Sequence, residues 1–282
     1  RRLLKALALY LKSQFVKYQQ WLTSAAWGIE RDRPNLYDLK KLPVPLSELS
    51  DGALTEWAKL YDEIVKAEER ERRTREKKKE NGQTLWGKQG DTSSQHSESL
   101  PKLDNLLKIM NDNVYQLLGI NKKQQWLIED MINVRMKLND GVFDAKEAIK
   151  FATEKEMDDF TRIFQEELDL FLDHTGNRKV HKVKVLYAGS STVIIVDHLT
   201  RSTITKPEVV KVQDSKIRQE LDELQERLTE TRSQWMYFTR CLRIYEKRRT
   251  YIFKPLQRLY WLKSQALAEA DDFIAEKLAT NK

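Results

Sequence analysis

Apolar residues recur at intervals of three and four along most of this chain, and this spacing constrains the fold more than any other feature. Near the start it produces one apolar stripe, made of Leu3, Leu4, Leu7, Leu11, Phe15 and Tyr18. An α-helix has 3.6 residues per turn, so side chains at this spacing share a face that can pack on a neighbour. Only nine glycines and six prolines interrupt the 282 residues. We therefore expect a mainly α-helical fold.

The period of the pattern changes in the C-terminal third. Within residues 179–212, apolar and polar residues alternate over residues 180–185, and a break at Gly189 precedes the mostly apolar run Thr192–Val196, which predicts a small antiparallel β hairpin or meander. From Ile217 to Trp235 a seven-residue repeat follows, which predicts a short coiled-coil segment. The expected architecture is a helical C-terminal domain with this coiled coil and a β insert.

A polar stretch near the middle divides the chain. Residues 68–80 contain charges of both signs and no apolar side chain, and residues 81–102 are rich in glycine, serine and amide residues. Such compositions do not bury enough apolar surface to form a core. The predicted organisation begins with the end of a recognition-type domain (residues 1–50) and a spacer helix (51–80). A flexible linker (81–102) and a helical C-terminal domain (103–282) follow.

Composition restricts the compartment and the chemistry. Cys241 is the single cysteine, which excludes an internal disulfide and multi-cysteine metal sites and fits a reducing compartment such as the cytoplasm. No run reaches the ~18 apolar residues that a membrane-spanning helix needs, so no membrane partner is expected. The first residue, Arg1, lies within an apolar helical pattern without an initiator methionine, so we expect a part of a longer protein.

Charge is segregated along the chain. The net charge is +7, and the segment Arg240–Lys263 alone, with eight basic residues and one acidic residue, also has a charge of +7. The segment Val142–Asp173 contains ten acidic and four basic residues, for a charge of −6. Charge is therefore divided between a basic C-terminal part and an acidic helical block, and the acidic block is expected to be a solubilising surface or a docking surface for a basic partner domain.

The residue patterns of common catalytic sites are absent from the sequence. There is no phosphate-binding glycine loop, no G-x-S-x-G motif and no H-E-x-x-H pairing among the four histidines. Acid-x-lysine triplets, as in magnesium nucleases, occur at Asp144–Lys146 and Asp214–Lys216, but a chain this charged contains several by chance. We expect no catalytic, cofactor or metal site in this chain by itself.

Basic residues alternate with aromatic residues between Arg240 and Lys263. Such a mixture predicts a surface that binds nucleic acid, since cations contact phosphates and aromatic rings stack on bases. The other interpretation is a charged surface over an aromatic core. The predicted contacts to double-stranded DNA are Lys182, Lys184, Arg240, Arg243, Lys247, Arg248, Arg249, Lys254 and Arg258.

Three N-terminal segments carry a family resemblance: Tyr10–Ser13, Ser24–Arg31 and Leu36–Pro45. Together they resemble the closing part of a target-recognition domain in adenine-specific DNA methyltransferases of restriction-modification and phage-defence systems. In this sequence Leu39 and Leu42 can anchor a turn, and two prolines then lead the chain into the next helix. Residues 242–270 more loosely resemble the C-terminal end of long methylases in the same group.

The resemblance implies that target recognition and catalysis lie in different parts of the protein. Such enzymes hold S-adenosylmethionine in a glycine-containing loop and bind the extruded adenine with an Asn/Asp-Pro-Pro-aromatic motif. This chain has no Pro-Pro pair, so the cofactor and catalysis are expected in an upstream methyltransferase domain. Arg31 and Arg33 lie in the connection that the resemblance places close to DNA.

The expected function is therefore DNA binding, target recognition and architecture in the C-terminal part of an S-adenosylmethionine-dependent adenine methyltransferase. Its expected partners are double-stranded DNA, the upstream domain and other subunits of a defence system. The alternative is a non-enzymatic helical scaffold, in which the acidic block and the coiled coil bind a protein partner and the basic stretch folds against the acidic block.

Overall fold

The structure, a computed structural model, forms two compact units, residues 1–128 and 129–282. The residues that it describes are 1–23, 36–80, 102–138, 142–174, 176, 179–189, 191–200, 205–213, 215–217, 219, 223, 235–238, 241–246 and 248–280. Each unit is described by itself.

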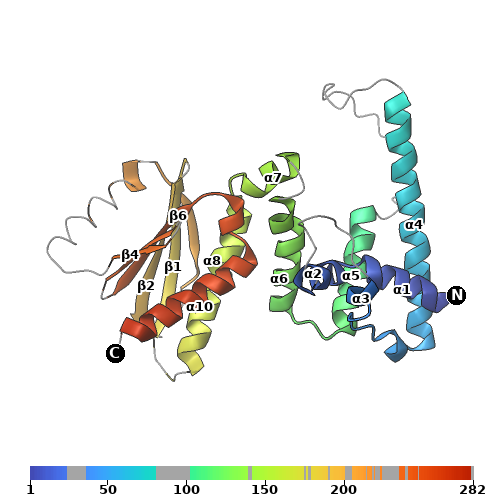
Figure 1. Cartoon of the computed structure of the whole chain (residues 1–282). Helices are drawn as coiled ribbons and strands as arrows, with labels where there is room; N and C mark the ends of the chain where they lie inside the picture. The colour runs from blue at the N-terminus through green and yellow to red at the C-terminus, as the bar shows by residue number, and fades with distance from the viewer. Residues whose placement is uncertain are drawn as a thin grey trace. The chain divides into compact units, whose positions relative to one another are not determined.

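Unit 1 is helical (Figure 1). Its elements are α1 (Arg2–Lys12), α2 (Gln14–Thr23), α3 (Leu36–Leu39), the 3-10 turn η1 (Leu46–Glu48), α4 (Asp51–Glu80), α5 (Leu103–Leu117) and most of α6 (Lys122–Asp130). The inner faces of α1, α4 and α5 meet in one core, which includes Leu9, Tyr10, Trp57, Ile64 and Met110. The apolar periodicity of the sequence therefore predicted these helices.

Ser13 separates the first two helices. Its backbone is extended, which ends α1, and its hydroxyl oxygen accepts a hydrogen bond from the Val16 amide at 3.4 Å at the start of α2. Lys5 and Asp62 form an ion pair between α1 and α4. At the start of α4, the Ser50 hydroxyl accepts a hydrogen bond from the Ala53 amide at 3.3 Å, so Ser50 caps this helix.

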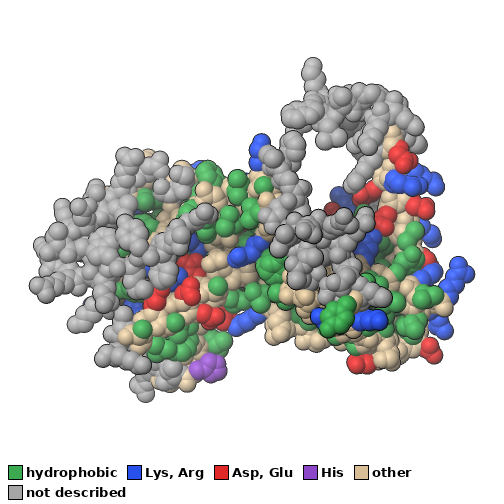
Figure 2. All heavy atoms as spheres, in the orientation of Figure 1, with side chains coloured by type: hydrophobic (Ala, Val, Ile, Leu, Met, Phe, Trp, Pro, Cys, Tyr) green, Lys and Arg blue, Asp and Glu red, His purple; other side chains and the backbone are tan. Residues whose placement is uncertain are grey.

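The outer part of α4 has no buried side chain after Ala67 among the residues described there. Charged side chains of both signs follow it (Figure 2), with pairs such as Arg72–Glu76 at 3.7 Å. The sequence predicted this solvated extension. Helix α5 follows the predicted linker, residues 81–102, of which only Lys102 is described, and it contacts α4 and α1 within unit 1.

Unit 2 combines helices with a sheet. Its helical elements are the π-helical turn η2 (Met131–Arg135), η3 (Met136–Leu138), α7 (Val142–Ile149), α8 (Glu154–His174), η4 (Arg258–Tyr260) and α10 (Lys263–Thr280). Its strands are β1 (Lys179–Ala188), β2 (Ser191–Thr200), β3 (Glu208–Lys211), β4 (Trp235–Phe238), β5 (Cys241–Tyr245) and β6 (Arg249–Pro255).

The sheet corrects the predicted fold class. Its six strands lie in the order β3-β1-β2-β6-β5-β4, and only the β1–β3 pair is parallel. The β1–β2 hairpin was predicted, with Gly189 in its turn at a φ of +54°. The expectation of a mainly α chain with a small antiparallel insert is wrong, because β4, β5 and β6 extend that hairpin. The predicted coiled coil lies mostly outside the described residues.

The two faces of the sheet differ. Helices α8 and α10 lie together against one face (Figure 1). On the opposite face, Leu186, Val193, Ile195, Ile244 and Tyr251 form a buried apolar cluster. Because successive side chains of a strand point to opposite faces of the sheet, every second residue of β5 and β6, including charged ones, points toward the helices.

Side chains of α8 cap one edge of β1. The amide of His181 donates to Asp169 Oδ1 at 2.8 Å, and the amide of Val183 donates to Gln165 Oε1 at 3.0 Å. Strand β3 pairs with β1 only from Lys184 onward. These side chains therefore satisfy backbone groups that an open strand edge would leave available for aggregation.

No helix in the described part of the chain is long and apolar enough to cross a membrane.

Candidate nucleic-acid interface

In unit 1, a hydrogen bond and a shared core join the two ends of the segment that carries the family resemblance. The Tyr10 hydroxyl, at the end of α1, donates a hydrogen bond to the Pro43 carbonyl oxygen. Tyr10 is fully buried, and Leu42 and Leu46 enter the same core. Thr23 and Leu36, which flank residues 24–35, belong to helices α2 and α3 that contact each other. The chain on both sides of residues 24–35 is therefore held within one core.

Burial raises the pKa of Tyr10 to about 12. An unfolded tyrosine ionises near pH 10, so the folded state retains this proton to higher pH than the unfolded state. The stabilisation is complete below pH 10 and is lost as the pH rises through 12. We expect Tyr10→Phe to lose stability less steeply than the wild type between pH 10 and 12, measured by urea unfolding at each pH. Parallel curves for the two proteins would contradict this expectation.

In unit 2, two of the predicted DNA contacts are buried. Arg243 exposes 4% of its side chain and Lys254 exposes 3%. Both extend from the sheet toward α10, where Lys254 Nζ lies 2.8 Å from Glu269 and Arg243 Nη1 lies 2.7 Å from Glu276. Lys254 Nζ also lies 3.5 Å from the ring centroid of Phe160. These two cations are part of the core between sheet and helices, so they are not placed to contact phosphates.

Other predicted contacts are partly exposed and ion-paired. Arg258 Nε donates to Glu156 at 2.5 Å, which joins the basic stretch to the acidic helix α8. Burial acts to raise the pKa of Glu156, but hydrogen bonds from Thr153 and the Arg258 guanidinium outweigh it, and the pKa is lowered. Lys182 and Lys184 both lie on β1 and pair with Glu208, at 3.2 Å and 3.6 Å respectively. The pKa of Glu208 is lowered, mainly by the hydrogen bond from Lys182.

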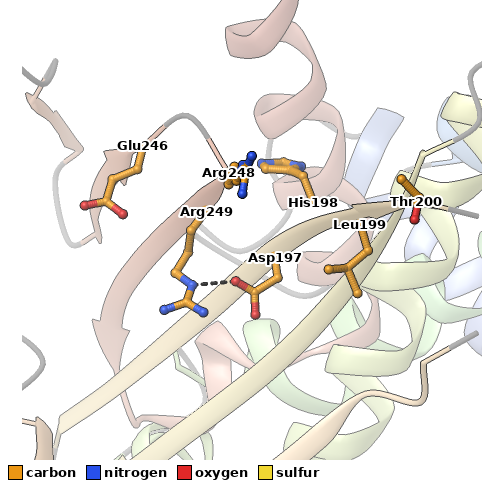
Figure 3. Close-up of a pocket in the computed structure, with 7 residues that line it drawn as sticks. All are labelled: Asp197, His198, Leu199, Thr200, Glu246, Arg248 and Arg249. Atoms are coloured by element: carbon orange, nitrogen blue, oxygen red, sulfur yellow. Dashed lines mark hydrogen bonds and ion pairs between the residues drawn. The ribbon is translucent and has the colours of Figure 1, made fainter. Parts of the chain in front are cut away.

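Arg248 and Arg249 line an open hollow of about 630 Å³ where β2 ends beside the β5–β6 turn (Figure 3). Arg249 is bound to Asp197, and this hydrogen bond raises the pKa of Arg249 further above its usual value. Arg248 is exposed, lies next to His198 in this view, and has no ion pair with a residue that the structure describes. Asp197 and Glu246 balance the two arginines, so the hollow has no charge preference for an anion.

Four predicted DNA contacts, Arg31, Arg33, Arg240 and Lys247, lie outside the described residues. The structure therefore brings Arg243 and Lys254 together with acidic partners on α10 and brings Arg248 and Arg249 to one hollow. It also places Lys182 and Lys184 together beside Glu208, and Arg258 beside Glu156. The prediction of DNA contact at these positions remains a prediction.

Sequence analysis missed the acidic partners on α10. Glu269 and Glu276 are seven residues apart, on the same helix face as the buried Phe273. An acidic residue within an apolar stripe signals a buried cation opposite it, and this signal was available in the sequence.

Two histidines also meet in this layer. His181 Nδ1 lies 2.9 Å from Asp169 Oδ1, and its ring centroid lies 5.1 Å from that of His198. Among the residues that the structure describes, no group of three or more His, Cys, Asp or Glu side chains could hold a metal ion. The Asp169–His181 pair joins α8 to β1 as part of the same edge capping.

No known family model, characterised protein or solved structure matches this chain.

Proposed function

We propose that this chain is the recognition and architectural C-terminal part of an adenine-specific DNA methyltransferase, with methyl transfer supplied by a domain outside it. The observation that supports the proposal most is the hydrogen bond from the Tyr10 hydroxyl to the Pro43 carbonyl oxygen. It joins the two ends of the segment that resembles a target-recognition domain. A recognition segment needs a rigid base, because flexible contacts lose entropy on binding. In this proposal residues 24–35, with Arg31 and Arg33, are the part of unit 1 that contacts DNA.

The charges of unit 2 agree with this assignment. Its basic stretch is largely engaged by Glu156, Glu269, Glu276 and Asp197. A cation that is already paired and desolvated gains little from a phosphate, since binding would first break the existing pair. In this proposal unit 2 thus contributes architecture.

The test is DNA binding by the double variant Arg31→Gln/Arg33→Gln. Each phosphate contact contributes about 0.9 to the slope of log affinity against log salt concentration. We expect this slope to fall by about two, with weaker binding to duplexes of every sequence, because phosphate contacts position the protein without reading bases. Fluorescence anisotropy of a labelled duplex at several salt concentrations measures it.

The matched control is Arg72→Gln/Arg73→Gln, which removes the same charge from the exposed outer part of α4. We expect it to change the slope by less than half as much. Equal losses for both double variants would contradict a specific role for residues 24–35.

A second candidate function is a scaffold that binds another protein. Arg258–Glu156 and Lys263–Asp159 join the basic stretch to the acidic block, as that alternative predicts. Absence of DNA binding by the wild-type chain even at low salt would favour the scaffold over the DNA-binding proposal.

A further inference from the structure

Tyr37 is an aromatic residue with 68% of its surface exposed, two residues after the end of the segment proposed to contact DNA. Lys41 lies one helical turn further along, and its Nζ is 4.1 Å from the centroid of the Tyr37 ring. Lys40 and Lys41 are both exposed. An aromatic ring and an ammonium group are thus presented together on the surface of unit 1.

The turn that carries this pair is anchored. Leu39 and Leu42 pack against the core of unit 1, and the Leu42 amide donates to the Leu39 carbonyl oxygen at 3.3 Å. One residue later, Pro43 accepts the hydrogen bond from Tyr10. Tyr37 is therefore exposed on a fixed turn whose leucines point inward.

We propose that Tyr37 and Lys41 contact an unpaired nucleobase and its phosphate. The Tyr37 ring stacks on the base, and the Lys41 ammonium lies beside the adjoining phosphate group. A base within a duplex has both faces covered by its neighbours, so the ligand is a base in a single strand or one extruded from a duplex. This inference rests on the proposed DNA-binding function and assigns to it a stacking residue.

The probe is a short single-stranded oligonucleotide that contains 2-aminopurine, whose fluorescence falls when the base stacks. The wild-type chain is expected to quench it on binding. Tyr37→Ala should abolish the quenching and weaken affinity by about tenfold, a typical size for one stacked base. Tyr37→Phe keeps the ring and should retain both the quenching and the affinity.

Two controls separate stacking from charge and from general loss of an aromatic residue. Lys41→Gln should lower the salt slope by about one while the quenching of the bound state remains. Phe151→Ala removes a ring that is 54% exposed in unit 2 and should change neither quantity.

The outcomes distinguish this inference from the function on which it rests. If Tyr37→Ala quenches as the wild type does, while duplex binding still depends on salt and on Arg31 and Arg33, the stacking role is wrong and the proposed function stands. If the wild-type chain binds neither the single strand nor the duplex at low salt, both are wrong.

Discussion

Glu269→Ala is expected to destabilise unit 2 by about 3–5 kcal/mol, the usual cost of removing one partner from a buried ion pair. Glu269 exposes 4% of its side chain, with Lys254 Nζ at 2.8 Å and Arg243 Nη2 at 3.9 Å. The substitution removes this carboxylate while the Lys254 ammonium remains desolvated between β6 and α10. The free energy of unfolding can be followed in urea by hydrogen exchange of peptides from β6.

Two further variants test the cause of this loss. Asp271→Ala removes an acidic residue from the exposed side of the same helix and should change stability by less than about 0.5 kcal/mol. Combining Lys254→Met with Glu269→Leu replaces the pair by apolar side chains and should recover most of the loss, since the desolvated charges are then removed together. A loss for Glu269→Ala no greater than that for Asp271→Ala would show that the pair does not stabilise the fold.

Phe160→Ala is expected to cost about 3–5 kcal/mol, the range for removing a large aromatic side chain from a core. Phe160 is fully buried on α8, and its ring centroid lies 5.1 Å from that of Trp261 and 5.9 Å from that of Phe164. It also contacts the Lys254 ammonium. The substitution therefore leaves a cavity and removes the ring that faces the buried cation.

The same urea and hydrogen-exchange measurement applies to Phe160→Ala. Phe160→Leu keeps most of the apolar volume but loses the cation–π contact, so its loss should lie between those of the wild type and the alanine variant. Phe151→Ala, on an exposed ring, should stay within about 0.5 kcal/mol of the wild type. Equal stability of Phe160→Ala and Phe151→Ala would contradict the central position of Phe160 in this core.

Residues near the start show how the sequence defines a candidate site. The spacing of Leu3, Leu7 and Leu11 predicted a helix here, and Leu39 and Leu42 predicted an anchored turn. The predicted inner face of that helix is wrong, because α1 buries Ala6, Leu9 and Tyr10 and exposes Leu3, Leu4 and Leu11. The family resemblance predicted Arg31 and Arg33 as DNA contacts. The hydrogen bond from Tyr10 to Pro43 was not predictable, because it joins residues 33 positions apart that only packing brings together.

The sequence by itself determined the local elements of this protein: the amphipathic helices, the β1–β2 hairpin and the solvated outer part of α4. Each depends on interactions within a few residues, so the pattern of apolar and polar side chains is sufficient. The tertiary structure alone decided that two cations of the basic stretch, Arg243 and Lys254, are buried. Arg243 and Lys254 have the same sequence signal as surface cations, but the register of β5 on β6 turns them toward α10, where Glu269 and Glu276 compensate for their desolvation.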